Sequence, residues 1–289
     1  MTRTSSKPVS KPVSKPVPFI ILLVLGLIAG TGVIVLNLLG NYKTSPIGLW
    51  IGLAFSAAYV AVLLLIFVVM RILPPRPWVW LPIALWWGAG AGMGFVMLSG
   101  EGVTNLFEQL GLPIFTVSLS GAWPEEIGKG VGTLLILLCI PALKRPWHGL
   151  AVGAFVGLGF VVIENIGYGV SGGIFNPVSD AAGVSQIWLT RTIAGPMQHA
   201  IFTGIAGWGI GLGLFSRGKS TAWRWTVALG FVLLGFFCHF LWNASPSDPM
   251  VNYMTMGVAA LVGYGTFIFL LFRARKLEKN SLHSGPVAQ

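Results

Sequence analysis

Long apolar stretches alternate with short polar or basic connections along almost the whole chain. A helix of about 20 apolar residues can cross roughly 30 Å of hydrocarbon. Stretches close to that length lie approximately at 18–40, 47–71, 78–98, 123–143, 148–172, 189–215, 222–246 and 250–272. The pattern predicts an all-α polytopic membrane protein, a bundle of about eight transmembrane helices.

The segments between these stretches are too short to form a separate soluble domain. The N-terminus repeats KPVS, a Pro-rich composition typical of an extended, disordered tail. We expect a disordered, basic, Pro-rich cytoplasmic tail at 1–17, three transmembrane helices at 18–98, an outer-side loop or interfacial segment at 99–122, a four-helix core at 123–246, a final transmembrane helix at 247–272 and a cytoplasmic tail at 273–289.

Composition supports a membrane protein, because 55% of the residues are hydrophobic, only 9% are charged and the mean hydropathy is +0.81. The net charge of +10 would also suit a nucleic-acid-binding protein. The basic residues are segregated, however: apart from Lys43, Lys129 and Arg191, they all fall on one side of the predicted membrane. The positive-inside rule therefore predicts a multi-pass protein of the cell membrane with both termini cytoplasmic, a partner of the lipid bilayer and not of nucleic acid.

Several apolar stretches contain polar residues that the bilayer should exclude. A charge at the centre of a membrane helix costs about 2.5–3.5 kcal/mol on insertion scales. The residues concerned are Glu125, Glu126, Glu164, His199, His239 and Asn243. Counting along the predicted helices brings them to one layer toward the outer face, which predicts a polar chamber among four helices.

Each polar residue also has a structural interpretation. Pro124 followed by Glu125 and Glu126 is typical of a helix start, so we expect the glutamates in the first turn of the fourth span. Lys129 is placed to neutralise either glutamate across one turn. Asn165 can cap or bridge helices, and a membrane histidine often makes an interhelical hydrogen bond.

Small residues and a proline suit a compact chamber. Glycines with small-xxx-small or similar spacing crowd the fifth and sixth spans, where they let helix backbones approach closely. They are Gly149, Gly153, Gly157, Gly204, Gly207 and Gly211. Pro196, three residues before His199, predicts a kink that frees a backbone carbonyl near the chamber.

Four short motifs follow one another on successive predicted helices. They are EExxK at 125–129, FxxxEN at 160–165, HAIFTG at 199–204 and HxxWN at 239–243. As a set they resemble the PrsW family of intramembrane proteases, which is distantly related to the CAAX-processing membrane proteases. The resemblance covers about residues 120–245.

The resemblance implies a peptidase that cleaves membrane-anchored protein substrates, for example anti-sigma factors. It makes the four-helix core the catalytic part of the chain. By motif position it assigns catalytic roles to Glu125, Glu126, Glu164, His199, His239 and Asn243. Lys129, Asn165 and Arg191 are the expected supporting residues.

Peptide hydrolysis needs an activated water and a group that stabilises the oxyanion. We favour Glu125 as the general base, with Glu126 held by the nearby lysine and with no cofactor. His239 and Asn243, one turn apart, can both point at the developing oxyanion. His199 can orient the water or protonate the leaving amine.

A zinc-dependent protease is the first alternative. His199, His239 and Glu164 would then be the Zn²⁺ ligands and Glu125 the base. Family members are described both as metallopeptidases and as glutamic peptidases, and the chain has no HExxH motif. The resemblance leaves the metal question open.

Other chemistries fit less well. An aspartyl protease needs two aspartates in the membrane, whereas Asp180 and Asp248 fall in predicted outer loops. Ser171 lies in a GxSG sequence at a helix end, without the rest of a serine-protease pattern. A proton-coupled membrane transporter also uses buried glutamates and histidines, but the polar residues here gather toward one face.

Arg191 runs against the charge rule because it lies on the outer side. It either snorkels at a helix end, or forms a salt bridge with Glu164, or holds the substrate backbone or carboxylate. The outer segments 99–122 and 173–188 adjoin the motif-bearing helices, so we expect them to flank the substrate entrance.

Overall fold

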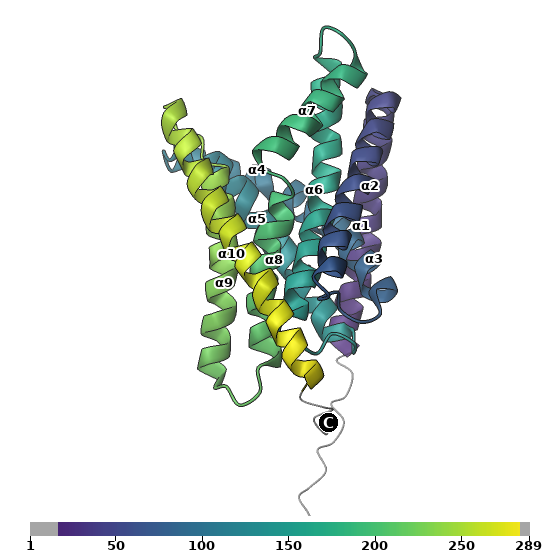
Figure 1. Ribbon diagram of the computed structural model, residues 1–289. Coiled ribbons are helices and arrows are strands. Elements are labelled where there is room, and N and C mark those ends of the chain that lie inside the picture. Colours follow the sequence, from purple (N-terminus) through teal and green to yellow (C-terminus); the bar gives the residue numbers. More distant parts are fainter. Residues whose placement is uncertain (1–16, 284–289) are drawn as a thin grey trace, which may run out of the picture.

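A computed structural model describes residues 17–283, so nearly all of the predicted N-terminal tail lies outside the described residues. The described part is helical and contains no strand (Figure 1). Its elements are α1 (Val17–Thr44), α2 (Pro46–Val69), α3 (Pro77–Trp87), the π-helical turn η1 (Gly88–Gly92), α4 (Met93–Gln109), α5 (Pro113–Cys139), α6 (His148–Ile174), α7 (Asp180–Ala194), α8 (Gln198–Phe215), α9 (Thr221–Trp242) and α10 (Pro249–His283). The predicted all-α class is confirmed.

Six helical segments of the described chain are long and apolar enough to cross a membrane, so the protein is a multi-pass membrane protein. They are α1, α2, α3 continued through η1 and α4, α6, α9, and α10 as far as Ser281. Two further parts complete the bundle: α5, which carries three charged residues, and α7 followed by α8 (Figure 1). Both parts carry residues of the polar chamber, which lowers their hydropathy.

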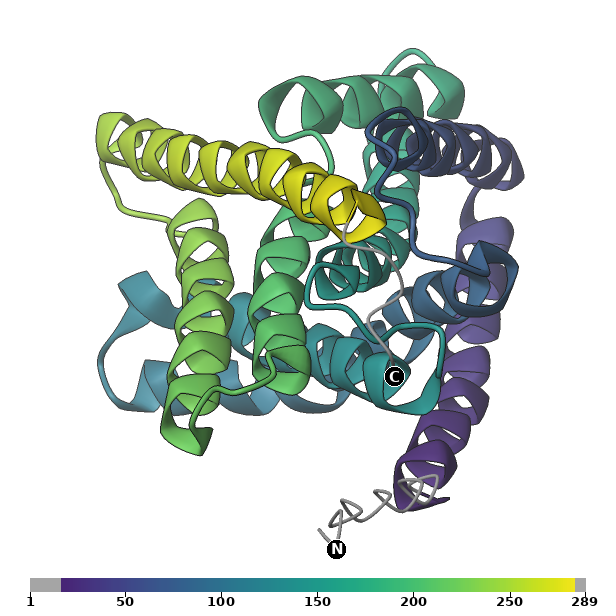
Figure 2. The ribbon, with the colours of Figure 1, turned by 60° about the horizontal axis from the view of Figure 1, so that its bottom comes forward.

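Helix α6 forms the centre of the bundle and is buried along most of its length. It contacts α1, α2, α3, α5, α7 and α8, and Figure 2 shows α1–α3 on one side of it and α8–α10 on the other. Glycines allow the closest contact, which is with α8: a Cβ on Gly149 would lie 2.0 Å from the carbonyl oxygen of Gly207. A Cβ on Gly157 would lie 2.1 Å from the carbonyl oxygen of His199. The predicted glycine packing is therefore confirmed, and it fixes the height of His199 against α6.

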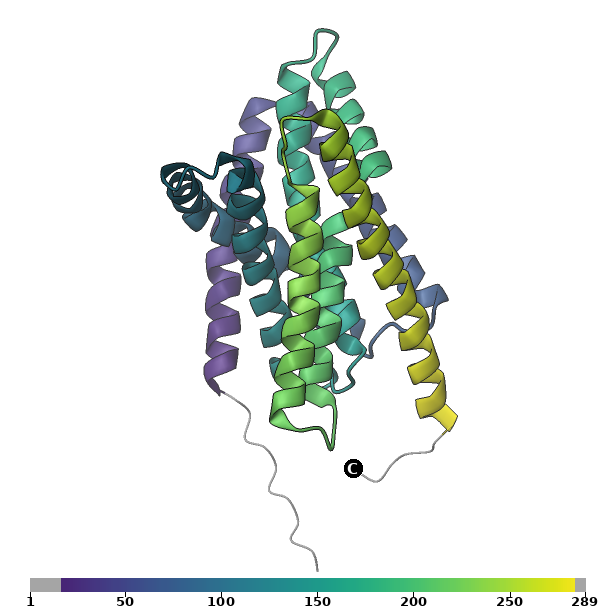
Figure 3. The ribbon, with the colours of Figure 1, turned by 90° about the vertical axis from the view of Figure 1, so that its left-hand side faces the viewer.

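The segment 99–122, expected to be an outer-side loop or an interfacial segment, is not an irregular loop. It is helical except for a short turn, because α4 continues the third span to Gln109 and α5 already begins at Pro113. Pro113 stands at the N-terminus of α5, where its missing N–H costs nothing. Pro124 therefore lies inside a helix, and the expectation that Glu125 and Glu126 occupy a first turn is wrong. Helices α4 and α5 pack against each other as a hairpin, and α4 projects sideways from the bundle (Figure 3).

The predicted sixth span is two helices, where a single kinked helix was expected. Helix α7 ends at Ala194 and α8 begins at Gln198, and Met197 between them has a left-handed backbone with φ of 55°. Pro196 cannot donate a backbone hydrogen bond, which favours a break here. Its carbonyl accepts a hydrogen bond from the Tyr264 hydroxyl of α10 at 2.9 Å. The break starts α8 at the level of the polar chamber.

The connections α2–α3, α5–α6 and α8–α9 and the end of α10 lie at one end of the bundle, which we call the basic end (Figures 1 and 3). It carries Arg71, Arg76, Lys144, Arg145, Arg217, Lys219, Arg224, Arg273, Arg275, Lys276 and Lys279. Part of the predicted C-terminal tail is helical, because α10 continues to His283. The described start of α1 lies at the same end, as an even number of crossings requires.

Candidate active site

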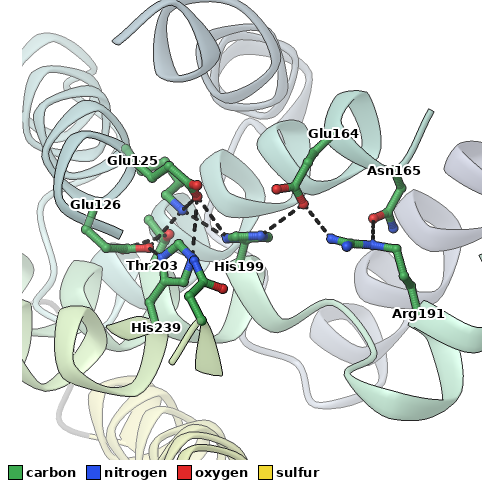
Figure 4. A network of polar contacts seen from close by, with 10 residues as sticks. Glu125, Glu126, Glu164, Asn165, Arg191, His199, Thr203 and His239 are labelled. Carbon is green, nitrogen blue, oxygen red and sulfur yellow. Dashed lines mark hydrogen bonds and ion pairs between the residues drawn. The ribbon is translucent and has the colours of Figure 1, made fainter. Parts of the chain in front are cut away.

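The polar side chains of α5, α6, α8 and α9 meet inside the bundle, and Figure 4 shows them from close by. All of them lie where α8 begins and α9 ends, about midway along α5. Glu125 and Glu126 are each 5% exposed, and Lys129 and His239 are 0% exposed. Charged groups this deeply buried are stable only when they are paired.

Lys129 joins the α5 glutamates to α8. Its Nζ lies 3.2 Å from Glu125 Oε2 and 2.8 Å from Glu126 Oε1. It also lies 3.1 Å from His199 Nδ1 and 4.4 Å from the centre of the Phe160 ring. One ammonium thus compensates two buried carboxylates, as expected from their spacing.

The contacts of His199 assign its protons. Nδ1 faces the Lys129 ammonium, which can only donate, so Nδ1 accepts. Nε2 lies 3.2 Å from Glu164 Oε2, and a carboxylate can only accept, so Nε2 carries the hydrogen. The Nδ1 lone pair is therefore directed into the cluster.

His239 has a matching arrangement. Its Nδ1 lies 2.9 Å from Glu126 Oε1 and donates to that carboxylate. Its Nε2 lies 3.1 Å from the Asn243 amide nitrogen, one turn along α9, and accepts from it. Each histidine is thus backed by a carboxylate on its outer nitrogen and presents an acceptor inward.

Three acceptor atoms converge as a result. Glu125 Oε2 lies 3.5 Å from His199 Nδ1 and 3.6 Å from His239 Nε2. These three atoms, each a possible metal ligand, all lie within 4.8 Å of one another. The two imidazole nitrogens already accept hydrogen bonds from Lys129 and Asn243, so a water molecule or a cation can bind them only in place of these donors, whereas Glu125 Oε2 keeps further lone pairs for a water molecule or a proton.

The same set fits a zinc ion by ligand type. Zinc bonds of about 2.0–2.1 Å in a tetrahedron place neighbouring ligands roughly 3.4 Å apart, close to the two distances from Glu125. Metal-bound histidines commonly donate their other N–H to a carboxylate, as both histidines do here. The set differs from the expected zinc alternative, because Glu125 joins the histidines while Glu164 contacts the outer nitrogen of His199.

Arg191 extends the network outward from α7. Its Nη2 lies 2.5 Å from Glu164 Oε2, and its Nε donates to the Asn165 side-chain oxygen. Its guanidinium also lies 4.4 Å from the centre of the Tyr168 ring. Among the interpretations of Arg191, the salt bridge with Glu164 is the one observed, and Asn165 supports it.

The expected catalytic and supporting residues all belong to one connected network. Two neighbours were missed: Phe160, and Thr203, whose hydroxyl lies 3.5 Å from Glu126 Oε2. Thr203 could have been found from its place one turn after His199. Ser171 lines a cavity of about 300 Å³ that also reaches Glu164.

Comparison with known families gives one match. The family described as PrsW family intramembrane metalloprotease matches residues 76–272, well over half of the chain. The match contains all the residues of the network described above. No curated protein and no solved structure matches the chain.

Proposed function

Because this chain belongs to the PrsW family of intramembrane metalloproteases, we propose that it cleaves membrane-anchored proteins, such as anti-sigma factors, within the bilayer. The observation that supports the proposal is the convergence of Glu125, His199 and His239 on one buried point. Peptide hydrolysis in an apolar medium needs a place that holds water and takes up its proton. Glu125 Oε2 is the acceptor for the proton in this proposal, and the two imidazole nitrogens lie 3.5 and 3.6 Å from it.

In the proposed reaction Glu125 is the general base. A water molecule held by Glu125 attacks the carbonyl carbon of the scissile bond while Glu125 takes its proton. The C–N bond then breaks as Glu125 passes that proton to the leaving amine, which leaves the new carboxyl group on the other product. The cavity of about 300 Å³ beside Glu164 is lined partly by polar residues and supplies a route for water.

The neighbouring groups orient this reaction. The second N–H of the Asn243 amide is free of its bond to His239 and can donate to the oxyanion. The Lys129 ammonium adds positive charge beside the developing negative charge. Glu126 and Glu164 act as positioning residues, because each holds an imidazole in the form that presents its lone pair inward.

A zinc ion, if bound by Glu125, His199 and His239, would supply Lewis acidity and a more acidic water. We propose the metal-independent form, because the Lys129 ammonium already contacts two of the three atoms that would bind the metal, Glu125 Oε2 and His199 Nδ1. If Glu125 Oε2 bound the metal, the same oxygen could not also act as the general base.

We also propose that the basic end faces the cytoplasm and that the protein resides in the cell membrane. Apart from Lys43, Lys129 and Arg191, the basic residues of the described chain gather at that end, as the positive-inside rule predicts. A cysteine introduced at position 178, which is 80% exposed in the opposite loop, should react with an impermeant maleimide added to intact cells. A cysteine at 219 should not, and the reverse pattern would overturn the orientation.

The test of function uses purified protein in lipid vesicles with a single-span reporter. Wild type should cleave the reporter before and after treatment with a zinc chelator. Glu125→Gln should lose at least about 100-fold in kcat, because an amide cannot accept the proton. Asp248→Asn, the same carboxylate-to-amide change at an exposed position just before α10, is the matched control and should keep full activity.

The outcomes separate the two mechanisms. Loss of cleavage on chelation, restored by added Zn²⁺, would contradict the metal-independent form and make the histidines ligands. Unchanged cleavage in both Glu125→Gln and Glu126→Gln would contradict the proposed site altogether. Circular dichroism of each variant checks that the helices are intact.

A further inference from the structure

An apolar cavity of about 440 Å³ leads away from the candidate active site toward the basic end. It lies between α5, α8 and α9, with Glu126 at its inner end and Arg224 near its outer end. Glu126 contacts both Lys129 and His239, so the inner end of the cavity lies next to the polar cluster. The other lining side chains are almost all apolar.

The walls leave this cavity open to the bilayer. Trp225 and Leu229 of α9 line it and are 64% and 52% exposed. A Cβ placed on Gly130 of α5 would meet nothing within 4 Å, so the glycine faces open space. The size is typical of a ligand pocket, which is about 300–1,000 Å³.

The far end of the cavity is held in place from within the chain. The Arg224 guanidinium donates to the carbonyl oxygens of Ser216 at 2.6 Å and of Leu214 at 3.3 Å. These bonds tie α9 to the end of α8, where helix carbonyls lack partners. The arginine is therefore engaged in closing the basic end of the cavity.

We infer that this cavity is a specificity pocket, which binds apolar side chains of the substrate on the basic-end side of the scissile bond. This inference rests on the proposed protease function. Along α5 the cavity extends from Glu126 to Leu134, about 12 Å at 1.5 Å per residue. An extended substrate segment of three or four residues covers that length at about 3.3 Å per residue.

A lipid acyl chain is the rival occupant, because it could enter from the same face. The position of the cavity next to Glu126 favours the substrate, since a substrate chain with its scissile bond at the cluster must continue into a neighbouring space. Substrate preference then follows from volume. A large apolar side chain fills the pocket, whereas alanine leaves part of it unfilled.

Gly130→Leu fills the pocket without disturbing the protein contacts of α5. The experiment uses the single-span reporter, with each of the four residues on the basic-end side of the mapped cleavage site set in turn to Ala, Leu or Phe. Wild type should prefer Leu or Phe over Ala by about tenfold in kcat/KM at one or more of these positions. Gly130→Leu should abolish that preference while it still cleaves the Ala reporter.

Gly230→Leu is the matched control, because Gly230 also meets nothing within 4 Å and lies on α9 outside the pocket lining. It should keep the wild-type preference. A preference that survives in Gly130→Leu would overturn the inference. Failure of wild type to cleave any reporter would instead overturn the proposed function.

A binding measurement covers the case of a variant that fails to fold. Photoreactive benzoylphenylalanine replaces Leu229 in the Glu125→Gln background, which should bind the reporter without turnover. Cross-links should form to the reporter residues on the basic-end side, and a probe at Leu233, which is exposed but outside the lining, should give few. Cross-links to phospholipid alone would identify an acyl chain as the occupant and overturn the inference.

Discussion

Lys129 carries the ammonium that joins Glu125, Glu126 and His199, and its replacement by methionine tests how the cluster is stabilised. Methionine keeps the length and apolar stem of the side chain but removes the charge. Both α5 carboxylates are almost fully buried, so without the ammonium they lack a compensating charge and are not exposed to bulk solvent. The variant should therefore be strongly destabilised.

The magnitude follows from the distances. Two unit charges about 3 Å apart attract by roughly 5 kcal/mol at an effective dielectric constant of about 20, and Lys129 makes two such contacts, at 3.2 and 2.8 Å. The cost of burying the charges offsets much of this attraction. Breaking a buried ion pair typically costs about 3–5 kcal/mol, which is the loss of unfolding free energy expected for Lys129→Met.

The assay is denaturant titration in detergent micelles, with unfolding followed by tryptophan fluorescence. Lys144→Met, at an exposed position of the basic end, is the control and should shift stability by less than about 0.5 kcal/mol. Adding Glu126→Gln to Lys129→Met removes one uncompensated charge and should recover at least about 1 kcal/mol. A Lys129→Met protein as stable as wild type would refute this account of the cluster, and so would a double variant without recovery.

Two further predictions concern the supports of the site. Arg191→Lys should lower kcat/KM for the reporter about tenfold, because an ammonium cannot contact Glu164 and Asn165 as the planar guanidinium does; full activity would remove that role. Gly153→Ala should lower stability by about 1–3 kcal/mol, since its Cβ would lie 2.3 Å from the carbonyl oxygen of Thr203. The measurement is the unfolding midpoint, with Gly130→Ala, where space is open, as the control. Equal midpoints for the two variants would contradict this packing argument.

Local patterns were sufficient for several features. The hydrophobic stretches predict the long helices of the bundle, because each must cover the hydrocarbon thickness by itself. The spacing of Lys129 from the two preceding glutamates predicts their ion pairs, since residues three and four apart share a helix face. Helix ends were less accessible. The hairpin of α4 and α5 is stabilised by contacts between two moderately apolar segments, which a search for single apolar spans does not detect.

The sequence by itself determined that this is an all-α membrane protein with buried glutamates and histidines on four helices. A polar residue inside an apolar stretch can be recognised from the order of residues alone. Only the tertiary structure decided how those groups pair. Glu126 backs His239 while Glu164 backs His199, and Glu125 remains to join both histidines at the centre. These pairings depend on the depth and rotation of each helix, which are set where α6 and α8 meet through glycines and where α8 starts after Pro196. Which side chains of different helices meet depends on how the helices pack, and residue spacing along one helix does not determine it.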